Sequence, residues 1–212
     1  KGEKYIGAYV KDPQVGQHKW VMSFDLNSLY PHLIMQYNIS PEMLLPQTMP
    51  YNDNTIDEML SKQIDLSMLP EAQVARTPNG ALFRTKKQGF LPEMMQEMYN
   101  DRTIYKKKML IAQQQYEDTK DPKYLNDVSR YQNIQMARKI SLNSAYGAIG
   151  NEWFRYYDLK IAEGITTSGQ LSIRWIEKAL NGYLNKLLKS EEVDYVIASD
   201  TDSVYIRFDE LV

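Results

Sequence analysis

Residues 193–206 read VDYVIASDTDSVYI, two apolar, β-branched runs on either side of a short polar centre. Two such runs separated by turn-forming residues are typical of a β-hairpin, which here would carry Asp200 and Asp202 at its tip. Aspartate is common in turns because its side chain satisfies nearby main-chain amides. Taken alone, the pattern therefore favours an ordinary turn over a functional site.

A third acid changes this balance. Residues 18–25, HKWVMSFD, alternate imperfectly and predict a buried strand that ends at Asp25. Acids at the ends of neighbouring strands can converge, and a cluster of like charges is costly unless a cation neutralises it. The chain has no cysteine and only two histidines, which excludes thiolate zinc sites and disfavours a histidine site. Oxygen ligands of this kind suit magnesium, manganese or calcium.

The rest of the chain is mainly helical. A short helix is predicted after Asp25, with Pro31 in its first turn, and residues 38–88 are predicted to be loop with minor structure. Apolar periodicity predicts three long helices: Leu91 to about Glu117, Leu125 to Tyr146 with an end at Gly147 and Gly150, and Ile161 to Leu188. The first two would form a projecting antiparallel hairpin, because residues 118–122 break the pattern. The fold class is therefore α+β, with a layer of strands and helices interrupted by a helical hairpin.

Charge is unevenly distributed along the chain. The formal net charge is only −2, which in bulk argues against a nucleic-acid binder, yet residues 84–108 carry seven basic and three acidic side chains. Arg102 and Lys106 are four residues apart on one predicted helix, and Lys139 and Asn143 are four apart on the next, so each pair shares a face. These four donors suit a triphosphate, although a solvated charged face is the more common explanation of such a pattern.

Three segments together resemble a known family. Residues 25–31 (DLNSLYP), 139–147 (KISLNSAYG) and 200–203 (DTDS) are similar to the three polymerase motifs of family B DNA polymerases, in the same order and with a helical hairpin between them. Residues 151–158 (NEWFRYYD) and 5–10 (YIGAYV) further resemble the T-even-like phage members of that family. The resemblance covers essentially the whole chain.

The resemblance implies an antiparallel palm sheet with packed helices, interrupted by a fingers hairpin. Residues 1–88 and 152–212 would form the palm, and residues 89–151 the fingers. The expected reaction is template-directed addition of dNMP from dNTP to a primer 3′-hydroxyl, with release of pyrophosphate. Two Mg²⁺ ions, which Mn²⁺ can replace, would support it by the mechanism of other two-metal enzymes.

Site roles follow from the resemblance, residue by residue. Asp25, Asp200 and Asp202 would be catalytic. Asp25 and Asp202 would bind the metals together with the Leu26 carbonyl oxygen, and Asp200 would be a further ligand. The remaining sites concern the nucleotide, and the residues implied are Arg102, Lys106, Lys139 and Asn143 on the triphosphate, the amides of Ser28 and Leu29 on phosphate oxygens, Tyr30 under the deoxyribose, and Tyr146 and Gly147 beside the nascent base pair. Tyr30 would exclude a 2′-hydroxyl; by pattern alone, it is an aromatic core residue next to Ile34.

Two residues depart from the family pattern. His32 stands where the family usually has serine, and Ser199 precedes Asp200 where phage relatives often have glycine.

The expected partners are primer–template DNA, dNTP, a sliding clamp and replisome proteins. No apolar run of 18 residues and no signal peptide is present, so we expect no membrane partner and a location in the cytoplasm of a phage-infected bacterium. Without thumb and exonuclease domains, we expect the segment alone to be weakly active or inactive.

Three alternative functions are compatible with parts of the pattern. A metal-dependent glycosyltransferase also uses two nearby aspartates at a strand end, but it does not need Lys139 and Asn143 on a helical hairpin. A palm of another class, such as a reverse transcriptase, normally lacks the helix motif at 139–147. A degenerate palm kept as a DNA-binding or assembly module would be expected to have lost some of the metal or triphosphate ligands, and none is missing.

Overall fold

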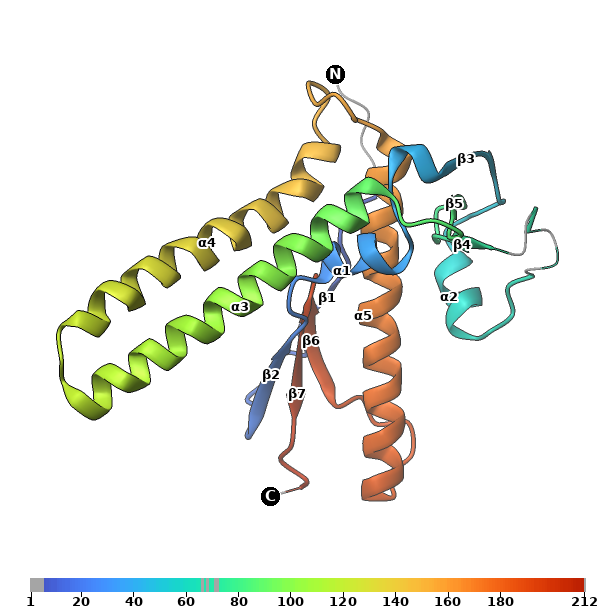
Figure 1. The fold of residues 1–212 in the computed structure, drawn as a ribbon. Helices are drawn as coiled ribbons and strands as arrows, with labels where there is room; N and C mark the ends of the chain where they lie inside the picture. The colour runs from blue at the N-terminus through green and yellow to red at the C-terminus, as the bar shows by residue number, and fades with distance from the viewer. Residues whose placement is uncertain (1–5, 66, 68, 71–72, 212) are drawn as a thin grey trace.

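The computed structural model describes residues 6–65, 67, 69–70 and 73–211. Tyr5, part of one family-like segment, lies outside these residues. The fold is α+β, as predicted (Figure 1). Its helices are α1 (Leu29–Gln36), α2 (Thr55–Leu60), α3 (Phe90–Thr119), α4 (Lys123–Ile149) and α5 (Leu159–Leu188), with a 3₁₀ turn at Pro41–Met43. Its strands are β1 (Val10–Lys11), β2 (Val21–Asp25), β3 (Leu44–Thr48), β4 (Val74–Arg76), β5 (Ala81–Arg84), β6 (Val196–Asp200) and β7 (Ser203–Arg207).

The predicted hairpin is β6–β7, and it forms the centre of a four-stranded antiparallel sheet in the order β1-β6-β7-β2. Thr201 adopts a left-handed conformation with φ of 56°, which allows the chain to reverse between Asp200 and Ser203. Ser203 also faces Asp25 in the β2–β7 ladder. The acid at the end of β2 is thereby brought to the tip of the hairpin, although 175 residues or more separate them in sequence.

The prediction that β2 is a buried strand was wrong. All five of its residues are exposed, including Met22 (55%) and Phe24 (50%). The physical reason is its position: β2 is an edge strand paired with β7, and its apolar residues are not covered by any part of the chain that the structure describes.

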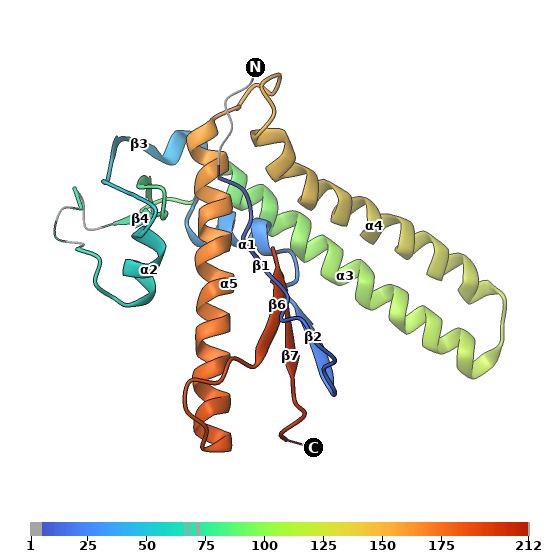
Figure 2. The same cartoon turned by 180° about the vertical axis from the view of Figure 1, so that it is seen from behind.

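Helix α5 connects the two main cores. Its N-terminal half packs Ile161 and Ile165 into a core shared with α1, α3 and α4, and its C-terminal half packs Ile173 and Leu184 against β6 and β7. Figure 2 shows the lower part of α5 beside the sheet and its upper part beside α1 and the start of the helical hairpin. The first turn of the helix is capped by Asp158, whose carboxylate accepts from the amide of Ile161 at 3.1 Å.

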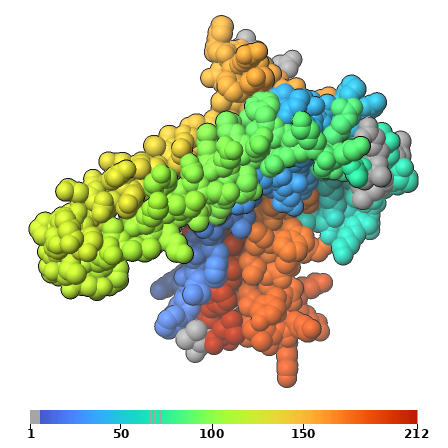
Figure 3. Space-filling model, viewed as in Figure 1, coloured from blue at the N-terminus to red at the C-terminus, as the bar shows by residue number. Residues whose placement is uncertain are grey.

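The predicted helical hairpin is present as α3 and α4, and it extends well beyond the rest of the molecule (Figure 3). The predicted end of α4 at Gly150 is confirmed, since the helix ends at Ile149 with Gly150 as its C-cap, but the predicted end at Gly147 was wrong because the helix continues through it. A glycine inside a helix costs only about 1 kcal/mol. Burial of Ile149 at 0% exposure compensates for it, so the helix does not end there.

Residues 38–88 contain more structure than predicted. They form a three-stranded sheet, β3-β5-β4, with helix α2 and a small core of Leu45, Met49 and Leu82. They also cap α3: the amide of Phe90 donates to Glu42 at 2.7 Å, and that of Gly89 donates to Asn38 at 2.9 Å. Side chains distant in sequence thus satisfy the free amides at the helix start and fix the base of the hairpin.

Candidate active site

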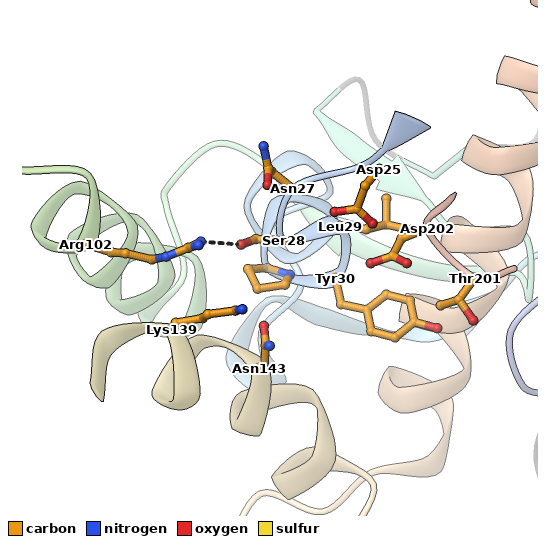
Figure 4. Close-up of a pocket in the computed structure, with 11 residues that line it drawn as sticks. Asp25, Asn27, Ser28, Leu29, Tyr30, Arg102, Lys139, Asn143, Thr201 and Asp202 are labelled. Atoms are coloured by element: carbon orange, nitrogen blue, oxygen red, sulfur yellow. Dashed lines mark hydrogen bonds between the residues drawn. The ribbon is translucent and has the colours of Figure 1, made fainter. Parts of the chain in front are cut away.

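A cavity of about 390 Å³ opens where the tip of β6–β7, the start of α1 and the base of the hairpin meet. Figure 4 shows it between the acids on one side and the side chains of α3 and α4 on the other. It is lined by Asp25, Asn27, Ser28, Leu29, Tyr30, Pro31, Arg102, Lys139, Asn143, Thr201 and Asp202. The cavity brings together residues from the three segments that resemble polymerase motifs, 25–31, 139–147 and 200–203.

Asp25 and Asp202 form the acidic wall. The amide of Leu26, which follows Asp25, donates to the carbonyl oxygen of Asp202 at 2.7 Å, so the backbone holds the two segments together. Burial raises the pKa of the Asp202 carboxyl, and the charge of Asp25 raises it further. The two carboxylates are close enough to repel each other, and a bound divalent cation would offset this repulsion.

Asp200 is placed differently from its neighbour. It is exposed, it does not line the cavity, and its carboxylate accepts from the Thr201 hydroxyl at 2.9 Å. Within the described part of the chain, no three Asp, Glu, His or Cys side chains form a cluster that could hold a metal. The acids that line the cavity are therefore the pair Asp25 and Asp202.

The opposite wall is cationic and polar. Arg102 of α3 lies across from Lys139 and Asn143 of α4, and its Nη1 donates to the hydroxyl of Ser28 at 3.2 Å (Figure 4). The Nε of Arg102 is buried and has no hydrogen-bond partner among the described residues. Lys106, one turn further along α3, instead lines a neighbouring hollow of about 170 Å³.

The start of α1 forms the third side of the cavity. Ser28 is its N-cap and adopts a left-handed conformation, with φ of 55° and ψ of 49°. Its carbonyl oxygen accepts from the His32 amide at 3.1 Å and from the His32 ring Nδ1 at 2.9 Å. Ser28 and Leu29 both line the cavity, and the amides at the start of a helix are good anion donors.

Tyr30 forms the base of the cavity and is also packed against the first core. Its ring lies 4.6 Å from that of Tyr146 between centroids, and a Cβ added to Gly169 of α5 would lie 3.0 Å from its Cε1. Tyr30 therefore packs against the core, as its sequence pattern alone predicted, and it also lines the cavity. Tyr146 and Gly147 do not line the cavity. Tyr146 packs against Tyr30, which does.

Residues 1–211 match the family description DNA polymerase family B. The chain belongs to DNA polymerase family B.

Similar proteins include phage and archaeal members of the family. The chain is 34% identical over 255 aligned positions to the DNA-directed DNA polymerase of Escherichia phage RB69, and 32% identical over 251 to that of Enterobacteria phage T4. Each alignment covers 99% of this chain and 27% of the relative. DNA polymerase 1 of Aeropyrum pernix is 31% identical over 97% of the chain and 18% of the relative. The chain thus spans about a quarter of the length of its phage relatives.

In this family B chain, three cavity residues were not predicted from the sequence. Asn27 and Pro31 lie inside the first family-like segment, and Thr201 lies between the two acids of the third. Their positions within these segments were the available signal. Of the two departures from the family pattern, Ser199 is buried, and its hydroxyl has no partner in the described part of the chain, whereas His32 is bonded to the Ser28 turn.

The family B chain contains no helix, among the residues described, that is long and apolar enough to cross a membrane.

Proposed function

We propose that this chain is the nucleotidyl-transfer centre of a template-directed DNA polymerase, which adds dNMP from dNTP to a primer 3′-hydroxyl and releases pyrophosphate. One observation carries the proposal: a single cavity has two interacting carboxylates on one wall and Arg102, Lys139 and Asn143 on the other. An anionic substrate would neutralise the cationic wall, and divalent cations would neutralise the acidic one. Membership of family B supports the same reaction.

The acidic wall fits the expected Mg²⁺ ions in its donor chemistry. Asp25 and Asp202 offer carboxylate oxygens; burial of Asp202, and then the charge of the exposed Asp25, raise the pKa of the Asp202 carboxyl. Together with the Leu26 carbonyl they would hold the metal, and Mn²⁺ would be accepted by the same oxygen ligands. Asp200 would join only if its carboxylate turned away from Thr201. When bound, two such ions would activate the primer hydroxyl and stabilise the leaving phosphate.

The chain's own residues would orient the triphosphate. Arg102 and Lys139 would carry the positive charge, Asn143 would add a neutral donor, and the amides of Ser28 and Leu29 would donate from the start of α1. The Nε of Arg102 is buried and unpartnered, so it would bind a phosphate oxygen only after the guanidinium turns toward the cavity. Lys106 would reach the same phosphates only after α3 moves toward the cavity, because it now lines the adjacent hollow. This positioning would hold the α-phosphate in line for attack by the primer hydroxyl.

Tyr30 would select the sugar. Its ring is held from behind by Gly169 and from the side by Tyr146, so it cannot move away from an added 2′-hydroxyl without disturbing both. Tyr146 and Gly147 would lie beside the nascent base pair. Gly147 is exposed, and a Cβ at this position would meet nothing within 4 Å, which leaves the surface open to a base.

The domain assignment follows the same reasoning. Residues 1–88 and 152–212 would be the palm, and residues 89–151, which include α3 and α4, would be the fingers. Primer–template DNA and dNTP would be the substrates, with a sliding clamp and replisome proteins as partners of the full polymerase. The phage relatives are about four times longer than this chain, so we expect the 212 residues alone to be weakly active or inactive.

Primer extension by the intact protein that contains this chain tests the proposal. We expect Mg²⁺-dependent extension that Asp25→Asn and Asp202→Asn each reduce by at least about 100-fold, since each removes a metal ligand. Asp12→Asn is the matched control, because Asp12 is an exposed acid outside the cavity. Near-normal extension by either cavity variant, or equal loss with Asp12→Asn, would contradict the proposal.

A further inference from the structure

His32 replaces the usual family serine, and its side chain contacts the nucleotide turn from behind. Its Nδ1 donates to the carbonyl oxygen of Ser28 at 2.9 Å, where the main-chain amide of His32 also donates at 3.1 Å. His32 itself does not line the nucleotide cavity. It lines a largely apolar groove on the other side of α1, together with Leu33 and Trp175.

The same ring contacts α3. His32 packs edge to face against Tyr99, with ring centroids 4.6 Å apart and an interplanar angle of 81°. Tyr99 and Arg102 are three residues apart on α3, so they share a face. Because Arg102 donates to the Ser28 hydroxyl at 3.2 Å, a closed loop of contacts is formed. We call it the α1–α3 loop of contacts, and its members are Ser28, His32, Tyr99 and Arg102.

This loop of contacts acts on two groups that face the cavity. The left-handed conformation of Ser28 is disfavoured for a residue with a side chain, so it needs support from its surroundings. The ring bond of His32 to its carbonyl oxygen provides that support. Through Tyr99, the same ring fixes the segment of α3 that presents Arg102. One side chain thus sets the position of donors on two walls.

A serine at this position could make the hydrogen bond to Ser28 but not the contact with Tyr99. A serine hydroxyl can donate to the carbonyl oxygen four residues earlier, as the His32 ring does here. Its side chain is too short to make a ring contact with Tyr99. The contact that ties α3 to the nucleotide turn is therefore specific to the histidine.

We propose that His32 is a positioning residue for the incoming nucleotide, which holds the Ser28 turn and Arg102 in place before the triphosphate arrives. This inference rests on the proposed function. It predicts an effect on nucleotide binding rather than on the chemical step, because the same donors contact the triphosphate in the ground state and in the transition state.

Three variants in the intact protein separate the two contacts of the ring. His32→Asn keeps a donor at the δ position and loses the ring; His32→Phe keeps a ring against Tyr99 and loses the donor; His32→Ala loses both. We expect each of the first two to raise the KM for dNTP by about threefold to tenfold, with kcat changed by less than about twofold, and His32→Ala to raise it further. Gln36→Ala, one turn along on an exposed position of α1, is the control.

A double-mutant cycle tests the loop of contacts itself. As a single substitution, Tyr99→Leu should raise the KM for dNTP. Combined with His32→Asn, in which the ring contact is already lost, it should raise this KM little further. A merely structural role for His32 would lower the melting temperature and the active fraction, and would leave KM unchanged. Unchanged KM in all three variants, or full additivity with Tyr99→Leu, would overturn the inference.

The outcomes for the two proposals are distinct. If the unaltered intact protein extends primers and Asp25→Asn does not, while the His32 variants keep the original KM, only the inference about His32 fails. If the unaltered protein does not extend primers at all, the proposed function fails, and the inference fails with it.

Discussion

The amide of Leu26 donates to the carbonyl oxygen of Asp202 at 2.7 Å, so the residue after one acid is bonded directly to the other acid. This bond and the pairing of Asp25 with Ser203 fix the backbone of both acids without using their carboxylates. The two carboxylates remain free to face the cavity and each other. In this arrangement burial, and then the charge of Asp25, raise the pKa of the Asp202 carboxyl, and we expect an effect on stability.

The stability of the metal-free protein should depend on Asp202 in a defined pH range. Its pKa is raised by burial and by Asp25, so the folded state binds this proton more tightly than the unfolded state. The favourable contribution is present below the unfolded pKa of about 4, and it is lost as the pH rises through the folded pKa. In EDTA, Asp202→Asn should melt above the unaltered protein at neutral pH, and the difference should shrink toward about pH 4.

Thermal unfolding with and without Mg²⁺ completes this test. Added Mg²⁺ should raise the melting temperature of the unaltered protein, since ligands of the folded state stabilise it, and should have little effect on Asp202→Asn. A lower melting temperature for Asp202→Asn in EDTA at neutral pH would show that the acids do not repel each other in the folded protein.

The sugar selectivity should depend on Tyr30. Tyr30→Ala removes the ring that the 2′-hydroxyl would meet, so discrimination between dNTP and rNTP should fall by at least about tenfold in the ratio of kcat/KM values. Tyr30→Phe keeps the ring and should keep the discrimination. Equal ratios for Tyr30→Ala and the unaltered protein would remove Tyr30 from this role.

Gly169 of α5 should affect nucleotide use through the position of the Tyr30 ring, which it contacts from the side away from the cavity. In Gly169→Ala the new methyl would lie 3.0 Å from Tyr30 Cε1, so the tyrosine must shift toward the cavity. The helix gain of about 1 kcal/mol would offset a similar packing cost, leaving stability nearly unchanged. We expect kcat/KM for dNTP to fall severalfold.

Gly182→Ala is the matched control on the same helix. A Cβ there would meet nothing within 4 Å, so this variant should be more stable by about 0.5–1 kcal/mol, with unchanged kcat/KM. An equal activity loss in both variants would mean that the helix as a whole, and not Tyr30, is responsible.

Lys139 should contribute to nucleotide affinity. Loss of a charge-assisted hydrogen bond costs about 1.5–3 kcal/mol, so Lys139→Ala should raise the KM for dNTP by roughly 10- to 100-fold. Lys107→Ala is the control, because Lys107 is an exposed lysine of the same hairpin that lines neither the cavity nor the adjacent hollow. Steady-state primer extension at varied dNTP concentration measures both, and similar KM values for the two variants would argue against a triphosphate contact.

Asn38 should matter for stability rather than for chemistry. It is 7% exposed, donates to the carbonyl oxygens of Arg84 and Lys87, and accepts from the Gly89 amide. Asn38→Ala would remove three hydrogen bonds to main-chain groups, one of them to the buried Gly89, and should cost about 2–4 kcal/mol in the free energy of unfolding. Asn126→Ala, at an exposed position of α4, should cost much less in the same denaturant titration.

The strongest local patterns in the sequence correctly predicted the main elements. The β6–β7 hairpin follows from two β-branched runs around a turn, and α3, α4 and α5 follow from long apolar periodicity. The β3-β5-β4 sheet was missed because its strands are three to five residues long and β3 contains Pro46, which only an edge strand tolerates. Short strands carry too little periodicity to be recognised, and tertiary pairing decides them.

Prediction of the site had a similar limit. Sequence spacing indicated that Arg102 and Lys106 share a helix face, but the tilt of α3 decides which one reaches the cavity, and only Arg102 does. Likewise, the spacing of Asp200 and Asp202 placed both at a hairpin tip. Only Asp202 lines the cavity, and the residue between the two acids, Thr201, has φ of 56°, a conformation that the residue type does not reveal. The roles of individual site residues stay predictions until the variants are measured.

The open edge of β2 has a practical consequence for handling these residues in isolation. It presents Met22 and Phe24 to solvent beside main-chain groups that are not paired by any strand the structure describes, and such an edge is a template for pairing with another molecule. Concentrated preparations of the segment should therefore self-associate through this strand before they unfold. A lysine at position 22 or 24 would be the first substitution to try for keeping it monomeric, since charge on an edge strand opposes such pairing.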